Sequence, residues 1–201
     1  MERFFDWFLL VALGCLACLG LGRAFMLAAR GVRVVVIDLQ RPTVEIVTGL
    51  LVGSCFCLWV YEIVAYAWPL ATNIIPQSLG TVIVHATGFK LVGTGLMIIG
   101  LLMYGIALWS FGTSWRLGID RDAPGVLVMG GIFARTRNPI YLSLDLLAIG
   151  TFLIQGILIF LLFTFVFVGM LHILIRLEER FLAETYGKDY RDYCARVRRY
   201  V

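Results

Sequence analysis

Long apolar stretches separated by short polar connections dominate this chain. The apolar stretches cover residues 4–27, 44–68, 87–112, 140–154 and 157–175. A helix needs about 20 residues to cross the hydrocarbon core of a bilayer, and four of the stretches have about that length. The stretch 140–154 is shorter, so we expect its helix to tilt or to enter only part of the bilayer. The pattern predicts about five transmembrane helices.

The last two stretches are joined by Gln155-Gly156 alone, which leaves room only for a tight helical hairpin. After residue 175 the chain becomes polar and basic, and we expect it to continue as a helix. The expected fold is therefore an all-α integral membrane protein. It has about five transmembrane helices, including a C-terminal helical hairpin, followed by a cytoplasmic amphipathic tail helix.

Composition supports the membrane assignment. Hydrophobic residues make up 61% of the 201 residues and charged residues 15%, whereas globular proteins average about 45–50% and about 25%. A soluble domain of this size would lack the polar residues needed to cover its surface. The composition excludes disorder, a secreted disulfide scaffold and a soluble nucleic-acid binder, and it indicates a bilayer as the surrounding solvent.

Arginine is distributed unevenly between the connections. The basic connections are the first, with Arg23, Arg30, Arg33 and Arg41, the third, with Arg116, Arg121, Arg135 and Arg137, and the C-terminal tail, with Arg180, Lys188, Arg191, Arg196, Arg198 and Arg199. The second connection, 69–86, contains no Lys, Arg, Asp or Glu. Because basic connections stay on the cytoplasmic side, we expect a multi-pass protein with its N-terminus outside and its C-terminus in the cytoplasm.

The five cysteines carry no clear metal or disulfide signal. Four of them lie inside apolar stretches, where a free cysteine packs as a small hydrophobe. The pair Cys55-x-Cys57 does not have the spacing of zinc ligands. We therefore expect no metal site.

Polar residues on the last two predicted helices form two stripes. The first stripe contains Asn138, Tyr141 and Asp145, and the second contains His172, Arg176 and Glu179. Residues three or four apart share a helix face, and the two helices of a hairpin can turn such faces toward each other. Because polar groups in a membrane are costly, they are candidates for function.

Each of these residues also has a structural interpretation. Arg176 and Glu179 could pair at the end of the helix, although the polar loop before Tyr141 favours a functional role. For His172 we favour a hydrogen-bonded packing role. For Asp145, capping a neighbouring helix and binding a ligand are equally supported.

The loop 125–139 has features of an anion site. Gly130-Gly131 permits close approach of the backbone to a ligand, and Arg135-x-Arg137 supplies two guanidinium groups. Pro139 begins a helix whose free N–H groups favour an anion. The loop could hold a carboxylate or a phosphate.

Two sequence blocks resemble a known superfamily. Residues 127–142 read LVMGGIFARTRNPIYL and resemble the pattern L-V-x-x-G-P-Y-R-x-x-R-H-P-x-Y-L. After the hairpin come E-E-x-x-L from Glu178, then Y-G-x-x-Y-x-x-Y from Tyr186, and V-x-R from Val197. In order and spacing these blocks resemble the isoprenylcysteine carboxyl methyltransferase and phospholipid methyltransferase superfamily of integral membrane enzymes, from about residue 114 onward.

The resemblance implies S-adenosylmethionine as cofactor, bound on the cytoplasmic side, and a lipophilic acceptor that enters from the bilayer. Together with the apolar pattern, it divides the chain into N-terminal transmembrane helices over 1–112 and a methyltransferase-like cofactor-binding and catalytic region over 113–201. The residues that fall on the family's cofactor-binding positions are Gly131, Phe133, Arg137, Asn138, Pro139, Tyr141, Glu178 and Tyr190. Arg176 and Glu179 match a pair that lies beside the reacting groups, so they are the candidate catalytic residues.

The sequence departs from the family pattern at three positions. Asn138, Ile132 and Phe133 stand where the family has His, Pro and Tyr. Asparagine forms hydrogen bonds but does not titrate near neutrality. An ionised carboxylate acceptor would need little acid–base help, whereas an amine acceptor would have to lose a proton, for which Glu179 or His172 would be the candidate base.

Two alternative functions fit the same sequence. One is an NADPH-dependent reductase of a sterol or isoprenoid double bond, because such reductases share a similar tail with Tyr193-Cys194 and a basic end. The other is a non-catalytic membrane protein that binds lipid or a partner. The sequence favours the methyltransferase but does not distinguish O- from N-methylation, and it leaves the acceptor and the oligomeric state open.

Overall fold

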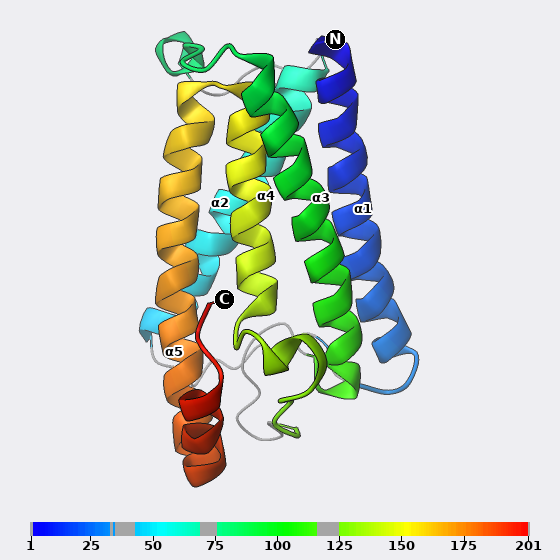
Figure 1. Cartoon of the computed structure of the whole chain (residues 1–201), viewed down its shortest axis with the longest axis vertical. Helices are drawn as coiled ribbons and strands as arrows, with labels where there is room; N and C mark the ends of the chain where they lie inside the picture. Colours follow the sequence, from blue (N-terminus) through cyan, green and yellow to red (C-terminus); the bar gives the residue numbers. More distant parts are fainter. Residues whose placement is uncertain (1, 33, 35–42, 69–75, 116–124, 201) are drawn as a thin grey trace.

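The structure is a computed structural model that describes residues 2–32, 34, 43–68, 76–115 and 125–200. Its long helices are α1 (Glu2–Ala28), α2 (Thr43–Ala67), α3 (Thr87–Ser110), α4 (Pro139–Gln155) and α5 (Leu158–Arg196) (Figure 1). Each begins within a few residues of a predicted apolar stretch, and the described residues form no strand. The prediction of an all-α membrane protein is confirmed.

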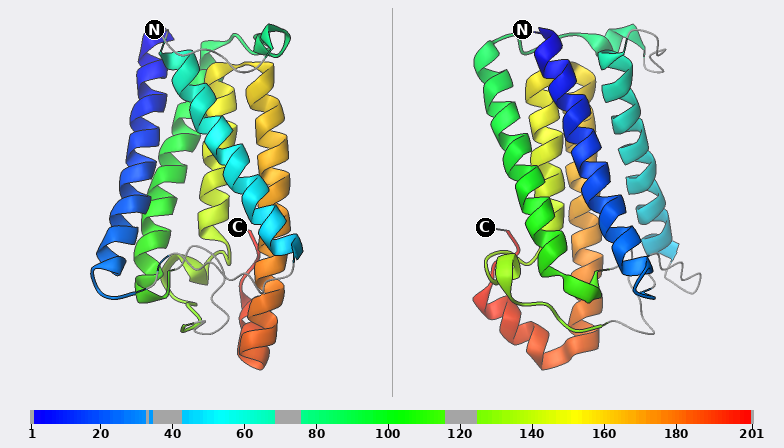
Figure 2. Two further views of the ribbon diagram at one scale, coloured as in Figure 1. Left: turned by 180° about the vertical axis from the view of Figure 1, so that it is seen from behind. Right: turned by 90° about the vertical axis from the view of Figure 1, so that its right-hand side faces the viewer.

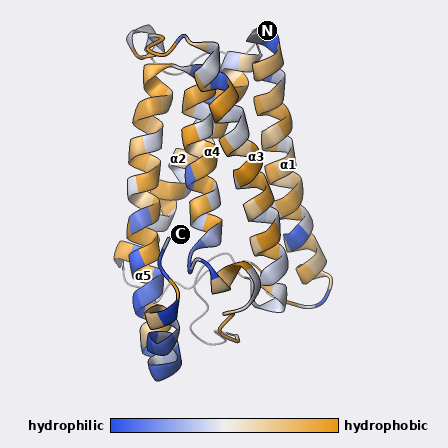
Figure 3. Cartoon of the chain, in the orientation of Figure 1, coloured by the Kyte–Doolittle hydropathy of each residue, from blue (hydrophilic) through white to orange (hydrophobic). Residues whose placement is uncertain are grey.

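Four of these helices are long and apolar enough to cross a bilayer, namely α1, α2, α3 and α5. Helix α4 has only 17 residues, or about 26 Å at 1.5 Å per residue, against a hydrocarbon core of roughly 30 Å. It is therefore the short fourth helix that the sequence predicts. Large apolar side chains remain exposed on the outer faces of the bundle, including Phe25, Phe165 and, at 82% exposure, Trp109. Figure 3 shows that hydrophobic residues predominate along most of the bundle.

The helices run up and down, so the connections alternate between two ends (Figures 1 and 2). We call the end that carries the 3-10 turn η3 (Gly131–Ala134) and the end of α5 the site end. The other end, where α4 meets α5 and where the N-terminus lies, is the joint end. This is the alternation that the arginines predict. Arg33, Arg41, Arg116 and Arg121 lie outside the described residues.

Small residues allow α3 and α4 to pack backbone against backbone. A Cβ on Gly93 would lie 2.7 Å from the carbonyl oxygen of Gly150, and one on Gly150 would lie 2.4 Å from Met97. Gly100 meets the carbonyl of Ser143 in the same way, at 2.9 Å. Helices in membranes associate through such small residues. This packing fixes α4, which begins at the candidate site.

The predicted tight hairpin is confirmed at Gly156. This residue caps α4 with a left-handed backbone, at φ 65°, and its N–H donates to Phe152 O at 2.7 Å. The carbonyl of Gly156 accepts hydrogen bonds from the N–H groups of Ile83 (2.7 Å) and Val84 (3.1 Å). The extended segment before α3 thereby closes the joint end with backbone bonds alone.

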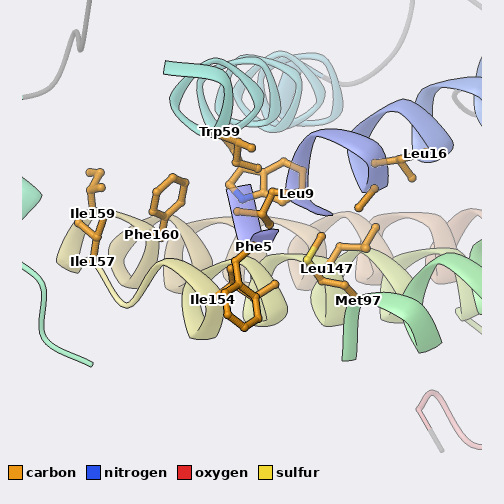
Figure 4. Packing of buried hydrophobic residues seen from close by; sticks show 12 residues of the cluster. Phe5, Leu9, Leu16, Trp59, Met97, Leu147, Ile154, Ile157, Ile159 and Phe160 are labelled. Atoms are coloured by element: carbon orange, nitrogen blue, oxygen red, sulfur yellow. The ribbon is translucent and has the colours of Figure 1, made fainter. Parts of the chain in front are cut away.

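The apolar core lies between the helices toward the joint end. Its largest buried members include Leu9 on α1, Trp59 on α2, Met97 on α3 and Phe160 on α5 (Figure 4). Every wall of the bundle contributes to this cluster, so the helices share one core there. Toward the site end this filling is incomplete, and a cavity takes its place.

Helix α5 extends further than the apolar stretch 157–175 predicts. It continues to Arg196, and Gly187 interrupts it with a non-helical backbone at φ 53° and ψ −113°. Hydropathy marks only the part in contact with lipid, whereas the helix itself stops at a backbone break. Beyond Gly187 the predicted tail helix turns back toward the bundle (Figure 2).

Candidate functional site

A cavity of about 640 Å³ opens between α1, α2 and the α4–α5 hairpin in the site-end half of the bundle. Its walls are mostly apolar and include Leu16 on α1, Phe56 on α2 and Phe167 on α5. Gly53 keeps the wall of α2 open, because a Cβ there would meet nothing within 4 Å, whereas Gly20 makes room for Tyr104, whose hydroxyl oxygen would lie 2.9 Å from a Cβ. The volume and lining are those of a site for a mostly apolar small molecule.

Polar groups gather at one place in the cavity wall, where the loop enters α4. Arg137, Asn138, Tyr141 and Glu178 all line the cavity. The Tyr141 hydroxyl donates to Glu178 Oε2 at 2.8 Å, which joins α4 to α5 across the hairpin. Within the part of the chain that the structure describes, the buried Nε of Arg137 has no hydrogen-bond partner. A polar ligand in the cavity could therefore find a donor here that the fold leaves unused.

Glu179 forms a second polar centre, on the other face of α5. Its Oε1 accepts from Asn138 Nδ2 at 3.2 Å and pairs with Arg137 at 3.3 Å. Its Oε2 accepts from Arg199 Nε at 3.0 Å and Nη2 at 2.6 Å. The carboxylate is only 11% exposed. Glu179 thus holds two cavity-lining residues in place without lining the cavity itself.

The turn η3 carries the loop into this site. Gly131 has φ 63°, and a Cβ there would also lie 2.8 Å from the hydroxyl oxygen of Ser110 at the end of α3. Phe133 packs edge-on against Phe111, with ring centroids 4.6 Å apart. These contacts fix η3 on α3, so that the residues from Arg137 onward enter α4 in a defined direction.

The tail helix supports the same loop from the other side. The buried Tyr193 hydroxyl donates to the carbonyl of Phe133 at 2.6 Å. Burial raises the pKa of Tyr193 to about 12, so its proton stays in place at neutral pH. Tyr190 packs beside Tyr193, with ring centroids 6.1 Å apart. Tyr193 thus holds the loop by a hydrogen bond, and Tyr190 supports it through packing.

The rest of the predicted polar stripe also faces the Glu179 side. Arg176 Nε donates to His172 Nε2 at 3.1 Å, and His172 Nδ1 lies 2.5 Å from the Tyr200 hydroxyl. His172 is therefore hydrogen-bonded, in keeping with the packing role expected for it. Asp145 has a buried Oδ1 that finds no hydrogen-bond partner among the described residues.

The structure divides the predicted site residues into two groups. The predicted residues that line the cavity are Phe133, Arg137, Asn138, Pro139, Tyr141 and Glu178. The others lie around it: Gly131 and Tyr190 support the loop, Glu179 is bonded to Arg137, and Arg176 is exposed beside His172. The two stripes do meet across the hairpin, through the bond from Asn138 to Glu179, and Tyr141 reaches Glu178, which lies beside the second stripe.

Sequence reasoning missed two contributions. The apolar cavity wall comes largely from α1 and α2, because no local signal says which face of a uniformly apolar helix turns inward. The C-terminal residues 197–200 also belong to the polar network, as the contacts of Arg199 show. The V-x-R block that ends at Arg199 was the available signal for the second.

A family model described as phospholipid methyltransferase matches residues 83–189. No individual characterised protein matches the chain significantly. The matched segment begins just before α3 and ends within the tail helix, so it contains η3, the start of α4, and Glu178 and Glu179. It covers more than half of the 201 residues. The chain therefore belongs to the phospholipid methyltransferase family, within the isoprenylcysteine carboxyl methyltransferase-like superfamily of membrane methyltransferases.

Proposed function

We propose that this protein transfers a methyl group from S-adenosylmethionine to a lipophilic acceptor, an isoprenylcysteine-type carboxylate or a lipid amine. The observation that carries the proposal is the cavity, which joins an apolar interior to the polar group of Arg137, Asn138, Tyr141 and Glu178. A lipophilic acceptor in the apolar interior and a charged cofactor at the polar group could meet there. The family supports methyl transfer to lipids.

The residues at the polar end fit the proposed cofactor. S-adenosylmethionine carries a positive sulfonium, an ammonium, a carboxylate and ribose hydroxyls. Glu178 offers negative charge to the cations, and the unused Nε of Arg137 offers a donor to the carboxylate or a hydroxyl. Aromatic surface is at hand from Phe133. The charged and polar groups at this end thus complement the charges of the cofactor.

The bound cofactor would supply an activated methyl group on a sulfonium. The chain's own contribution is then to position and to exclude water. Tyr141 holds the carboxylate of Glu178 in one orientation, and Asn138 cannot act as a base. A carboxylate acceptor would already be ionised and could attack the methyl group without losing a proton first. For an amine acceptor, Glu178 is the carboxylate that lines the cavity and could take the proton.

The two proposed catalytic residues take different roles under this mechanism. Glu179 acts as a positioning residue, because its contacts run to Arg137 and Asn138 rather than into the cavity. Arg176 stays a candidate catalytic residue, to be tested by Arg176→Ala. The regions 1–112 and 113–201 would share the work, the first supplying apolar walls for the acceptor and the second the polar chemistry.

We place the site end, and with it the C-terminus and the cofactor, in the cytoplasm. The described residues of the basic connections and of the tail lie at that end, and the uncharged residues 76–86 lie at the joint end (Figure 1). The positive-inside rule supports this orientation. Single cysteines introduced in the segment 76–86 should be labelled from outside in intact cells. Labelling only after permeabilisation would contradict the proposed orientation.

The proposed function is tested by titrating the purified, detergent-solubilised protein with S-adenosylmethionine, S-adenosylhomocysteine and NADPH in a calorimeter. We expect both sulfur compounds to bind. Binding of NADPH alone would favour the reductase alternative, which relied on Tyr193 and the basic tail. In the structure, Tyr193 and Arg199 already have partners in Phe133 and Glu179. A total lipid and protein extract with labelled cofactor would then show which fraction gains the methyl group.

Glu178→Gln supplies the test of the site itself. We expect it to weaken cofactor binding strongly, because it removes the carboxylate that faces the cavity. Glu184→Gln is the matched control, since Glu184 is exposed on the same helix. Equal affinities in the two variants would show that the cofactor binds elsewhere.

A further inference from the structure

The last four described residues, Val197 to Tyr200, leave the tail helix and run back along the α4–α5 hairpin (Figure 1). The Arg198 carbonyl accepts the N–H of Arg137 at 3.1 Å. The Arg199 carbonyl accepts from Thr136 Oγ1 at 3.1 Å and Asn138 Nδ2 at 3.3 Å. This segment, which we call the C-terminal strap, is thus bonded to three consecutive residues of the loop that enters the site.

The Arg199 side chain supplies a further connection. Both its Nε and its Nη2 bond to Glu179 Oε2, whereas Glu179 Oε1 faces Arg137 and Asn138. One carboxylate therefore shares its charge between two guanidinium groups. If Arg199 were absent, the whole charge of a nearly buried carboxylate would act on Arg137. Arg137 would then be drawn toward Glu179 and away from the cavity that it lines.

Tyr200 anchors the end of the strap. Its ring stacks on His172, with centroids 6.0 Å apart and planes 25° apart. His172 Nε2 accepts a hydrogen bond from Arg176, so in the neutral ring the proton sits on Nδ1 and is donated to the Tyr200 hydroxyl oxygen. The anchor lies on a different part of α5 from Glu179, and it holds the strap independently of Arg199.

We propose that Arg199 is a positioning residue for the cofactor site: through Glu179 and the strap backbone it sets Arg137 and Asn138 in the cavity wall. The proposal rests on the proposed function for its consequence on cofactor affinity. Its structural part, that the strap orders the 136–138 loop, stands without a ligand. The family match ends at residue 189, before the strap, so this role comes from the contacts alone.

The experiment compares the full-length variants Arg199→Ala, Arg199→Lys and Arg196→Ala in detergent. Arg196 is the matched control, because it is exposed at the end of α5, just before the strap, and its Nε bonds locally, to the Asp192 carbonyl. Two quantities are measured: the Kd for S-adenosylhomocysteine by calorimetry, and amide hydrogen exchange of the peptide containing 136–138 without ligand.

For Arg199→Ala we expect a Kd at least about tenfold weaker and faster exchange at Arg137, since one partner of a nearly buried charge pair is removed. Arg199→Lys should restore part of the affinity, and Arg196→Ala should match the wild type in both measurements. Combining Arg199→Ala with Glu179→Gln should add little to Glu179→Gln alone, because the two residues act as one unit.

The outcomes separate the two proposals. If Arg199→Ala leaves both exchange and Kd at the level of Arg196→Ala, the positioning role is wrong while the function stands. If the wild type binds no S-adenosylhomocysteine, the proposed function fails, and hydrogen exchange alone then decides the role of the strap. Additive losses in the double variant would also overturn the positioning role.

Discussion

Glu178 and Glu179 are neighbours in sequence, yet they lie on different faces of α5. Glu178 lines the cavity and receives one hydrogen bond, from Tyr141. Glu179 faces the C-terminal strap and is surrounded by Arg137, Arg199 and Asn138. Because one residue turns an α-helix by about 100°, two adjacent carboxylates can serve different purposes. The cavity face is open to a ligand, whereas the strap face is filled by the chain itself.

Arg137 belongs to both faces, so its removal should have the largest effect. It lines the cavity and pairs with Glu179 at 3.3 Å, with 13% of its side chain exposed. We expect Arg137→Ala to lower kcat/KM for methyl transfer by about 100-fold or more, because it removes a ligand contact and leaves a nearly buried charge less compensated. Arg135→Ala is the control, since Arg135 is exposed. Similar losses in both would mean that only net charge matters.

Substitution of one tyrosine on each face compares the cavity face and the strap face directly. Tyr141→Phe removes the hydroxyl that orients Glu178 on the cavity face, and we expect about tenfold weaker binding of S-adenosylhomocysteine. Tyr200→Phe removes a hydroxyl on the strap face but keeps the ring that stacks on His172, so we expect a change of about threefold. Calorimetry measures both. A larger effect from Tyr200→Phe would reverse the assignment of the two faces.

The apolar end of the cavity should affect the acceptor alone. A side chain on Gly53 would project into open space in the cavity wall, so Gly53→Leu should fill part of it. We expect a raised KM for the lipid acceptor with an unchanged Kd for S-adenosylhomocysteine. Gly49→Leu, one turn earlier on α2 and outside the cavity lining, should change neither. Weaker cofactor binding in Gly53→Leu would place the cofactor deeper than we propose.

Substitutions at the joint end should lower the stability of the protein and have the smallest effect on its function. Gly156 has φ 65°, and a Cβ there would lie 2.1 Å from the Val84 carbonyl oxygen. We expect Gly156→Ala to destabilise the protein by about 1–3 kcal/mol, measured by thermal unfolding in detergent, with cofactor affinity retained. Gly95→Ala is the control, because its Cβ meets nothing within 4 Å. A stable Gly156→Ala variant would show that the joint tolerates rearrangement.

The elements of this fold could be predicted because hydropathy reports contact with lipid directly. Helices α1 to α4 begin and end close to the predicted stretches. The far end of α5 could not be placed this way, since residues 176–196 leave the apolar region without leaving the helix, and the backbone break at Gly187 turns the last of them back. The hydropathy pattern therefore locates the edge of the bilayer but not the end of the helix.

The candidate site divides in the same manner. The loop motif and the family resemblance identified Arg137, Asn138, Tyr141 and Glu178, because the loop, its proline and the adjacent acids Glu178 and Glu179 can be read directly from the sequence. They assigned Glu178 to cofactor binding and Glu179 to catalysis, but which of the two lines the cavity depends on what packs against each face of α5. They also gave no role to Arg199, which reaches Glu179 only because the chain reverses after the tail helix.

The sequence by itself determined the membrane class, the helices, the tight hairpin and the residue types at the site. These depend on composition, on period and on neighbours along the chain. Only the tertiary structure decided which apolar faces of α1 and α2 wall the cavity, and which carboxylate the cavity receives. Those choices depend on contacts between segments far apart in the chain, where many helix rotations would bury similar apolar surface and packing alone selects one.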